Sequence, residues 1–180
     1  MEELSLHILD VAENSIAAGA RNLTIVVYED DESDVLRLEI DDDGRGMSEG
    51  IAARAADPFY TTRSTRRVGM GLALLHEAAA RSGGSMELRS VPGVGTTVRA
   101  TFRLSHVDRQ PLGNMVDTIL ALIASSARVD IVYRHTRNGK TFEIRTKDIR
   151  DKLAGAPVTS ADTLSLLRRY LIQEEDSLAQ

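Results

Sequence analysis

The stretch that decides the fold is residues 41–47, which read Asp41-Asp42-Asp43-Gly44-Arg45-Gly46-Met47 and close a predicted β-strand at Val35–Asp41. Glycines at positions 44 and 46 allow a tight turn and a close approach of the backbone to a ligand. A carboxylate two residues before the first glycine can accept a hydrogen bond from an amino group such as N6 of adenine. Taken alone, the stretch is equally well explained as an acidic surface turn, because short glycine patterns recur by chance.

A second motif lies upstream, in a helix predicted from Leu4 to Ala18 by apolar residues at helical spacing. Asp10 and Asn14 are four residues apart, so their side chains lie one turn apart on the same helix face. The carboxylate is suited to directing a water molecule, and the amide oxygen is suited to Mg²⁺, which prefers hard oxygen ligands. A polar stripe on a solvated helix is the alternative, and it is the more frequent explanation for such a pair in isolation.

A third motif, Arg67–Leu72, leads from a polar loop into a helix predicted at Met70–Ser82. Gly69 and Gly71 lie at its start, where free backbone N–H groups and the positive end of the helix dipole form a phosphate site. The loop also supplies cations that can neutralise phosphate, Arg63, Arg66 and Arg67. A flexible hinge is the alternative explanation for two glycines before a helix.

The remaining elements predict a first domain over residues 1–106. They are the strands Leu23–Tyr28, Ser85–Ser90 and Thr96–Leu104 and a helix at Gly50–Ala56. The polar segment Ser105–Leu112, which contains a proline, is the expected boundary.

Residues 107–180 are expected to form a small appended helix–hairpin–helix module of unknown role. An amphipathic helix runs from Met115 to Ile123, and strands at Val129–His135 and Thr141–Arg145 flank Asn138-Gly139, a strong type I′ turn signal. Counting back from that turn places Tyr133 opposite Ile144 and Arg134 opposite Glu143. Helices are expected at Lys147–Leu153 and at Ala161–Ile172, the latter capped by Thr159 and Asp162.

Composition narrows the classes of function. The chain contains no cysteine, which excludes disulfides, thiolate metal sites and thiol nucleophiles. A net charge of -5 disfavours nucleic acid as a partner, since such binding depends on clustered Lys and Arg. No apolar run approaches the roughly 20 residues of a membrane span. The acidic start, Met1-Glu2-Glu3, is unlike a secretory signal, so we expect a cytoplasmic location and no membrane partner.

The order and spacing of these motifs along the chain are more informative than any one motif alone. The Asp10–Asn14 helix, the Asp-x-Gly-x-Gly turn, the segment Asp57–Thr62, the Gly69–Leu72 motif and the closing Pro92–Thr96 turn follow one another in a set series. This series resembles the N, G1, F and G2 boxes of the GHKL, or Bergerat-fold, ATPases. That superfamily includes gyrase-type topoisomerases, Hsp90-type chaperones, histidine kinases and mismatch-repair ATPases. The resemblance covers residues 4 to about 104.

The resemblance implies an α+β fold, a two-layer sandwich in which helices cover one face of a mostly antiparallel sheet, with the C-terminal module appended. It also implies ATP and Mg²⁺ as ligands. Asn14 matches the asparagine that holds Mg²⁺, Asp10 the general base, and Asp42 the residue that binds adenine, with Gly44 and Gly46 closing the pocket floor. Residues 61–68 match the lid. The other expected nucleotide contacts are Met47, Phe59, Arg63, Arg67, Gly69, Met70, Gly71, Leu72 and Thr96, the last supporting Asp42, often through water.

Two departures from the family pattern, and the sequences in and around the motifs, indicate which branch of the superfamily the chain resembles most. The base position holds Asp10 where hydrolysing members have Glu, and the lysine that many histidine kinases place after the N-box asparagine is missing. The segment Glu13–Ala20 resembles mismatch-repair ATPases, whereas Asp57–Arg63 and Gly69–Leu74 resemble histidine kinases. The kinase-type domain is the better match.

The resulting hypothesis is a histidine-kinase-like enzyme that passes the γ-phosphate of ATP to a separate partner protein. Only six residues precede His7, so we expect no acceptor segment before it and a packing role for His7 itself. One alternative is an ATP hydrolase or ATP-gated switch with Asp10 as base. Another is a nucleotide sensor whose C-terminal module docks on a partner, with its amphipathic helix available for homodimerisation.

Overall fold

The computed structural model describes residues 3–55, 71–153 and 155–179. It contains a six-stranded sheet in the order β3-β4-β2-β1-β5-β6, in which only the β1–β5 pair is parallel. The strands are β1 Asn22–Asp30, β2 Val35–Asp42, β3 Ser85–Val91, β4 Gly95–Arg103, β5 Asp130–Arg137 and β6 Lys140–Arg145. The helices are α1 Leu4–Ala17, α2 Glu49–Ala55, α3 Gly71–Arg81, α4 Met115–Ser125, α5 Thr146–Lys152 and α6 Ala161–Leu178.

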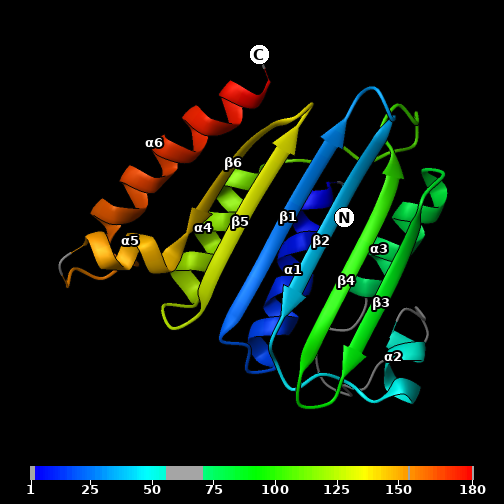
Figure 1. Ribbon diagram of the computed structural model, residues 1–180, viewed down its shortest axis with the longest axis horizontal. Helices are drawn as coiled ribbons and strands as arrows, with labels where there is room; N and C mark the ends of the chain where they lie inside the picture. Colours follow the sequence, from blue (N-terminus) through cyan, green and yellow to red (C-terminus); the bar gives the residue numbers. More distant parts are fainter. Residues whose placement is uncertain (1–2, 56–70, 154, 180) are drawn as a thin grey trace.

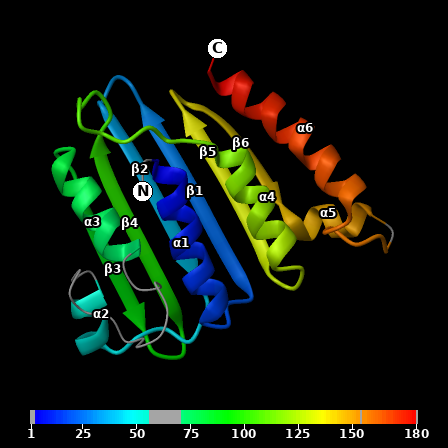
Figure 2. The ribbon, with the colours of Figure 1, turned by 180° about the vertical axis from the view of Figure 1, so that it is seen from behind.

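Helices α1, α3 and α4 lie side by side across one face of the sheet, and the other face is open (Figures 1 and 2). Helix α6 packs against α4 and β6 at the far edge. This arrangement confirms the predicted α+β sandwich with helices on one face of a mostly antiparallel sheet. None of the described helices is long and apolar enough to cross a bilayer.

Alternation along the strands explains this layering. In β1 the side chains of Leu23, Ile25 and Val27 are fully buried, while the residues between them face the open side. Helix α1 meets this apolar face with Leu4 and Ile8, which are also fully buried. Because successive strand residues point to opposite faces, one sheet surface forms the core and the other remains polar.

The C-terminal part extends the same sheet. Its hairpin has the predicted register, with Tyr133 opposite Ile144 and Arg134 opposite Glu143, so this prediction is confirmed. Asn138 and Gly139 have φ values of 48° and 80°, as a type I′ turn requires. Strand β5 pairs with β1 from Asn22 to Glu29, and the buried cluster runs without a break from the N-terminal strands into β5, α4 and α6.

The last helix differs from its prediction at both ends. The predicted cap of Thr159 with Asp162 is wrong: Ser160 is the N-cap, and its Oγ accepts a hydrogen bond from the Thr163 N–H at 3.3 Å. A cap must directly precede the first helical residue, which is Ala161. The helix also runs to Leu178 rather than Ile172, because the polar segment before Leu178 carries a residue with a tertiary partner, Glu175.

That partner is His135, whose side chain is 3% exposed. Its Nδ1 lies 2.8 Å from Glu175 Oε2 and its Nε2 lies 3.1 Å from Glu29 Oε1, while Tyr133 donates its hydroxyl to the other Glu175 oxygen at 2.6 Å. Burial opposes protonation of His135, but the two carboxylates outweigh it and raise its pKa to about 9. The imidazolium therefore ties the end of α6 to strands β1 and β5.

Raising the pH should loosen this tie. A group whose pKa is raised by folding contributes its full stabilisation below its unfolded pKa, near 6.5, and loses it as the pH rises through the folded value of about 9. We expect the free energy of unfolding to fall by roughly 3 kcal/mol between pH 6.5 and 9.5 in urea titrations. His135→Gln should flatten this decline, and His76→Gln, on the exposed face of α3, should keep it. Parallel pH profiles for the wild type and His135→Gln would contradict the assignment.

Candidate nucleotide-binding site

Asp42 ends β2 with its side chain turned toward the helix layer, and the residue is only 8% exposed. Its Oδ2 accepts a hydrogen bond from Ser15 Oγ on α1 at 2.6 Å, and its Oδ1 accepts one from the Gly44 N–H at 2.8 Å. Both donors are neutral, so they fix the orientation of the carboxylate without an ion pair. The residue predicted to bind adenine is therefore buried and held in a single position between helix and sheet.

The turn after Asp42 requires its glycines. A Cβ on Gly44 would lie 2.9 Å from Asp42 Oδ1 and 3.1 Å from the Ala18 Cβ. Gly46 has φ +63°, and a Cβ there would overlap the Val91 carbonyl oxygen. Neither position tolerates a side chain, because the turn lies directly against its neighbours.

Backbone hydrogen bonds hold this turn between two layers. The Arg45 N–H donates to the Ala18 carbonyl at 3.0 Å, and the Arg45 carbonyl accepts from the Gly93 N–H at 2.8 Å. The turn is thus attached to the end of α1 on one side and to the β3–β4 turn on the other.

A pair of hydroxyl groups supports the same turn from the sheet. Thr96 lies opposite Asp42 in the β2–β4 register, and its hydroxyl is 2.8 Å from Ser90 Oγ. The Met47 N–H donates to Ser90 Oγ at 2.8 Å. Thr96 and Met47, both predicted nucleotide contacts, are therefore joined through Ser90 at one side of Asp42.

The predicted phosphate end of the site lies along α1. Asp10 and Asn14 are both half-buried on this helix, and the Asp10 carboxylate lies against Gly71, the first residue of α3. A Cβ on Gly71 would overlap Asp10 Oδ2 and lie 2.9 Å from Asp10 Cγ. The predicted base and a predicted phosphate-loop glycine are thus in contact, at the helix end whose dipole favours negative charge.

Other predicted residues are placed as follows. Leu72 is half-buried and packs against the core, and His7 is buried, with Nε2 2.9 Å from Gln110 Oε1. Burial lowers the pKa of His7, in keeping with the packing role expected for it. The described residues contain no cluster of three His, Cys, Asp or Glu side chains that could hold a metal ion. The following predicted contacts lie outside the described residues: Phe59, Arg63, Arg67, Gly69 and Met70.

Two supporting residues were missed from the sequence, Ser15 and Ser90. The signal for Ser15 was its place directly after Asn14, at a position that the apolar spacing of α1 turns inward. The signal for Ser90 was weaker, because it depends on the β3–β4 register that sets it opposite Thr96.

Together these groups fit an adenine nucleotide with a divalent cation. Asp42 offers a buried acceptor for an amino group, Asn14 offers an amide oxygen of the kind that Mg²⁺ prefers, and the start of α3 offers a phosphate site. The acceptor and the phosphate site are connected by one helix, α1.

Comparison with known proteins shows which family contains a domain of this kind. The chain is 38% identical over 105 residues to the sensor protein kinase FleS of Pseudomonas aeruginosa. The aligned region covers 58% of this chain and 25% of FleS. It is 31% identical over 112 residues to the non-motile and phage-resistance protein of Caulobacter vibrioides, covering 57% of this chain and 13% of that protein. The chain thus spans a quarter or less of the length of these two relatives.

Two solved structures share the fold. The N-terminal domain of a DNA repair protein matches with a TM-score of 0.54 at 15% identity, over 80% of this chain and 52% of that chain. The Aquifex aeolicus MutL ATPase domain complexed with ADP matches with a TM-score of 0.52 at 13% identity. This match covers 85% of this chain and 68% of the MutL chain. Residues 2–106 match the family model for the histidine kinase-, DNA gyrase B- and HSP90-like ATPases. The chain belongs to this family, the GHKL ATPases, and its ATP-binding domain is of the histidine-kinase-like type.

Proposed function

We propose that the protein binds Mg-ATP and transfers the γ-phosphate to a separate partner protein. The observation that carries the proposal is the pairing of a buried adenine acceptor, Asp42, with a phosphate end where Asp10 meets Gly71. The sequence relatives favour the kinase branch, since FleS is named as a sensor protein kinase. Of the histidines in this chain, His7 is buried beside Gln110 and His135 is buried between Glu29 and Glu175, which makes these two unsuitable as phosphoacceptors.

Each residue has a distinct role in this proposal. Asp42 accepts the adenine amino group, and its bond from Ser15 keeps the acceptor oriented. Asn14 holds Mg²⁺, which would neutralise phosphate charge when bound. The N-terminus of α3 adds backbone donors for the phosphates. Phosphoryl transfer depends chiefly on such positioning and charge neutralisation, so the site needs no covalent intermediate.

Hydrolysis of ATP is a second candidate, favoured by the place of Asp10. Its carboxylate lies at the phosphate end, against the first residue of α3, where an attacking water would be activated. Asp is one methylene shorter than the Glu of hydrolysing relatives, which favours transfer over hydrolysis.

Phosphate release by the purified protein with Mg-ATP distinguishes the two functions. Under the kinase proposal we expect tight nucleotide binding with little release of inorganic phosphate, because the chemistry awaits an acceptor. Asn14→Ala should weaken the binding of Mg-ATP more than that of ATP with EDTA. Steady release that disappears in both Asn14→Ala and Asp10→Ala would instead establish a self-contained hydrolase with Asp10 as base.

Asp42→Asn should weaken ATP binding by about tenfold or more, because an amide can present a donor toward the adenine amino group where an acceptor is required. Isothermal titration with a non-hydrolysable ATP analogue measures the change. Asp41→Asn, one residue earlier but on the open face, is the matched control and should bind as the wild type does. Equal affinities for the two variants would remove Asp42 from the adenine site.

Gly71→Ala should lower both stability and nucleotide affinity, because the new methyl group overlaps the Asp10 carboxylate. Gly50→Ala is the control, since its nearest neighbour would be the Arg54 guanidinium at 3.8 Å. Adding Asp10→Ala to Gly71→Ala should recover most of the lost stability, which a double-mutant cycle in urea quantifies. Additive losses in that cycle would show that the two residues do not meet in solution.

A further inference from the structure

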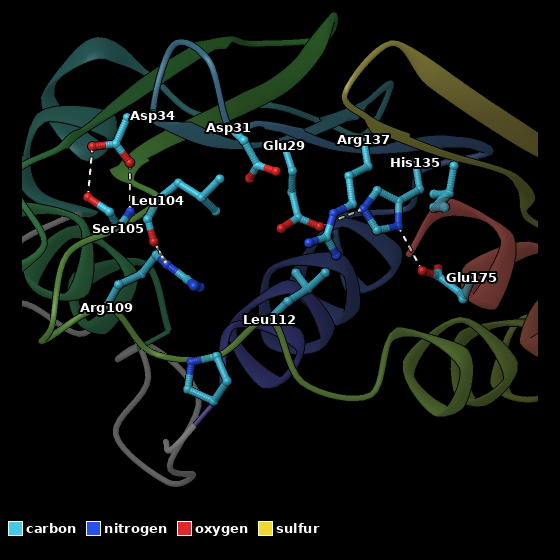
Figure 3. A pocket seen from close by; sticks show the side chains of 12 residues that line it. Glu29, Asp31, Asp34, Leu104, Ser105, Arg109, Leu112, His135, Arg137 and Glu175 are labelled. Carbon is cyan, nitrogen blue, oxygen red and sulfur yellow. Dashed lines mark hydrogen bonds and ion pairs between the residues drawn. The ribbon is translucent and has the colours of Figure 1, made fainter. Parts of the chain in front are cut away.

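A cavity of about 570 Å³ lies at the other end of β1 from the nucleotide site. The turn of the nucleotide site adjoins the start of β1, where Asp43 accepts a hydrogen bond from the Asn22 N–H. Glu29, near the end of β1, lines the cavity. Its remaining wall comes from the β1–β2 turn, the segment between β4 and α4, strand β5 and the end of α6 (Figure 3). The volume is within the range of small-molecule sites, roughly 300–1,000 Å³.

The carboxylates of this cavity already have partners. Glu29 and Glu175 bind the two nitrogens of His135. Asp34 accepts hydrogen bonds from Arg103 Nε at 2.9 Å and from the Ser105 hydroxyl at 2.8 Å. Asp31 accepts from the Asn138 side-chain amide at 2.8 Å. The acidic side chains are thus committed to holding the walls together.

The two guanidinium groups that line the cavity, by contrast, keep N–H donors that have no acceptor among the described residues. Arg109 donates Nε to the Leu104 carbonyl at 2.7 Å and Nη1 to the Gln110 carbonyl at 2.9 Å, so backbone oxygens anchor it and leave Nη2 without an acceptor among the described residues. The Arg137 backbone pairs within the sheet, but its side chain makes no hydrogen bond and no ion pair within 4 Å to any residue in the described parts of the chain. Figure 3 shows the two side chains on different sides of the cavity, Arg109 beside Leu104 and Arg137 beside Glu29.

We propose that this cavity is a second ligand site, which binds a small organic anion through a carboxylate or phosphate group held by Arg109 and Arg137. Planar guanidinium groups with free N–H donors suit both kinds of oxyanion. The apolar side chains of Leu104, Pro111, Leu112 and Leu178 would contact the rest of the ligand. The site is distinct from the proposed nucleotide pocket and does not depend on ATP binding.

The charge of the walls permits an anion. The charged groups that face the cavity are Glu29, Asp31, Asp34, Glu175, His135, Arg109 and Arg137. Since the pKa of His135 is about 9, this side chain is a cation at neutral pH and offsets one of its two carboxylates. Arg103 offsets Asp34 from just outside the lining. Of the lining carboxylates, one of the pair Glu29 and Glu175 and the side chain of Asp31 then remain to oppose the charges of Arg109 and Arg137.

The test uses the full chain labelled with ¹⁵N, titrated with inorganic phosphate and separately with succinate at constant ionic strength. We expect amide shifts at Ser105, Leu112 and Arg137 with one or both probes. A response to phosphate alone identifies a phosphorylated ligand, and a response to succinate alone identifies a carboxylate. Shifts confined to Gly44 and Gly71, or no saturable binding below about 10 mM, would overturn the proposal.

Three variants show whether anion binding depends on this cavity: two replace an arginine, and one lies in the proposed nucleotide site. Arg137→Gln should weaken binding of the responding anion by about tenfold. Arg128→Gln removes the same charge just before the opposite end of β5, where the side chain is exposed, and should leave the affinity unchanged. Asn14→Ala should also bind the anion normally, even where it no longer binds Mg-ATP. Equal weakening by Arg137→Gln and Arg128→Gln would mean a nonspecific charge effect and would refute the site.

Discussion

The hydrogen bond from Ser15 to Asp42 joins the helix layer to the sheet at the centre of the nucleotide site. Removing a carboxylate from water is costly unless protein donors replace the solvent, so Asp42 can be buried only where Ser15 and the Gly44 N–H reach it. This requirement fixes the position of α1 along β2. It therefore also fixes Asn14 and Asp10, which follow on the same helix toward α3, and it leaves the turn at Gly44 no room for a side chain.

Strand β1 depends on the C-terminal part of the chain in a comparable way. It pairs with β2 on one side and with β5 on the other, so residues 130–137 cover what would otherwise be an exposed edge. Tyr133 and Leu171 belong to the same buried cluster as Leu23 and Ile25. The similarity to the MutL ATPase domain extends over 85% of the chain, more than residues 1–106 alone can supply, so the shared fold includes part of this C-terminal half.

Local signals predicted much of this architecture, and long-range contacts explain what they did not. Strand alternation, the Asn138-Gly139 turn and the glycines around Asp42 act within a few residues, and each predicted its element; the Asn138-Gly139 turn also predicted the register of its hairpin. The parallel pairing of β5 with β1 and the reach of α6 to Leu178 depend on partners far along the chain, such as Glu175 with His135. The same is true of the hydroxyl groups of Ser15 and Ser90, whose importance appears only once helix and strands are assembled.

Helix α1 contacts both of the sites that the structure suggests. Near its end it carries Asn14 and Ser15 at the nucleotide site, and at its start the Leu4 and Ser5 N–H groups donate to the carbonyls of Pro111 and Leu112 in the cavity wall. A nucleotide and a cavity ligand would therefore meet the same rigid element from opposite ends. If either ligand binds one position of α1 more tightly than another, linkage requires that it change the affinity for the other ligand by the same factor.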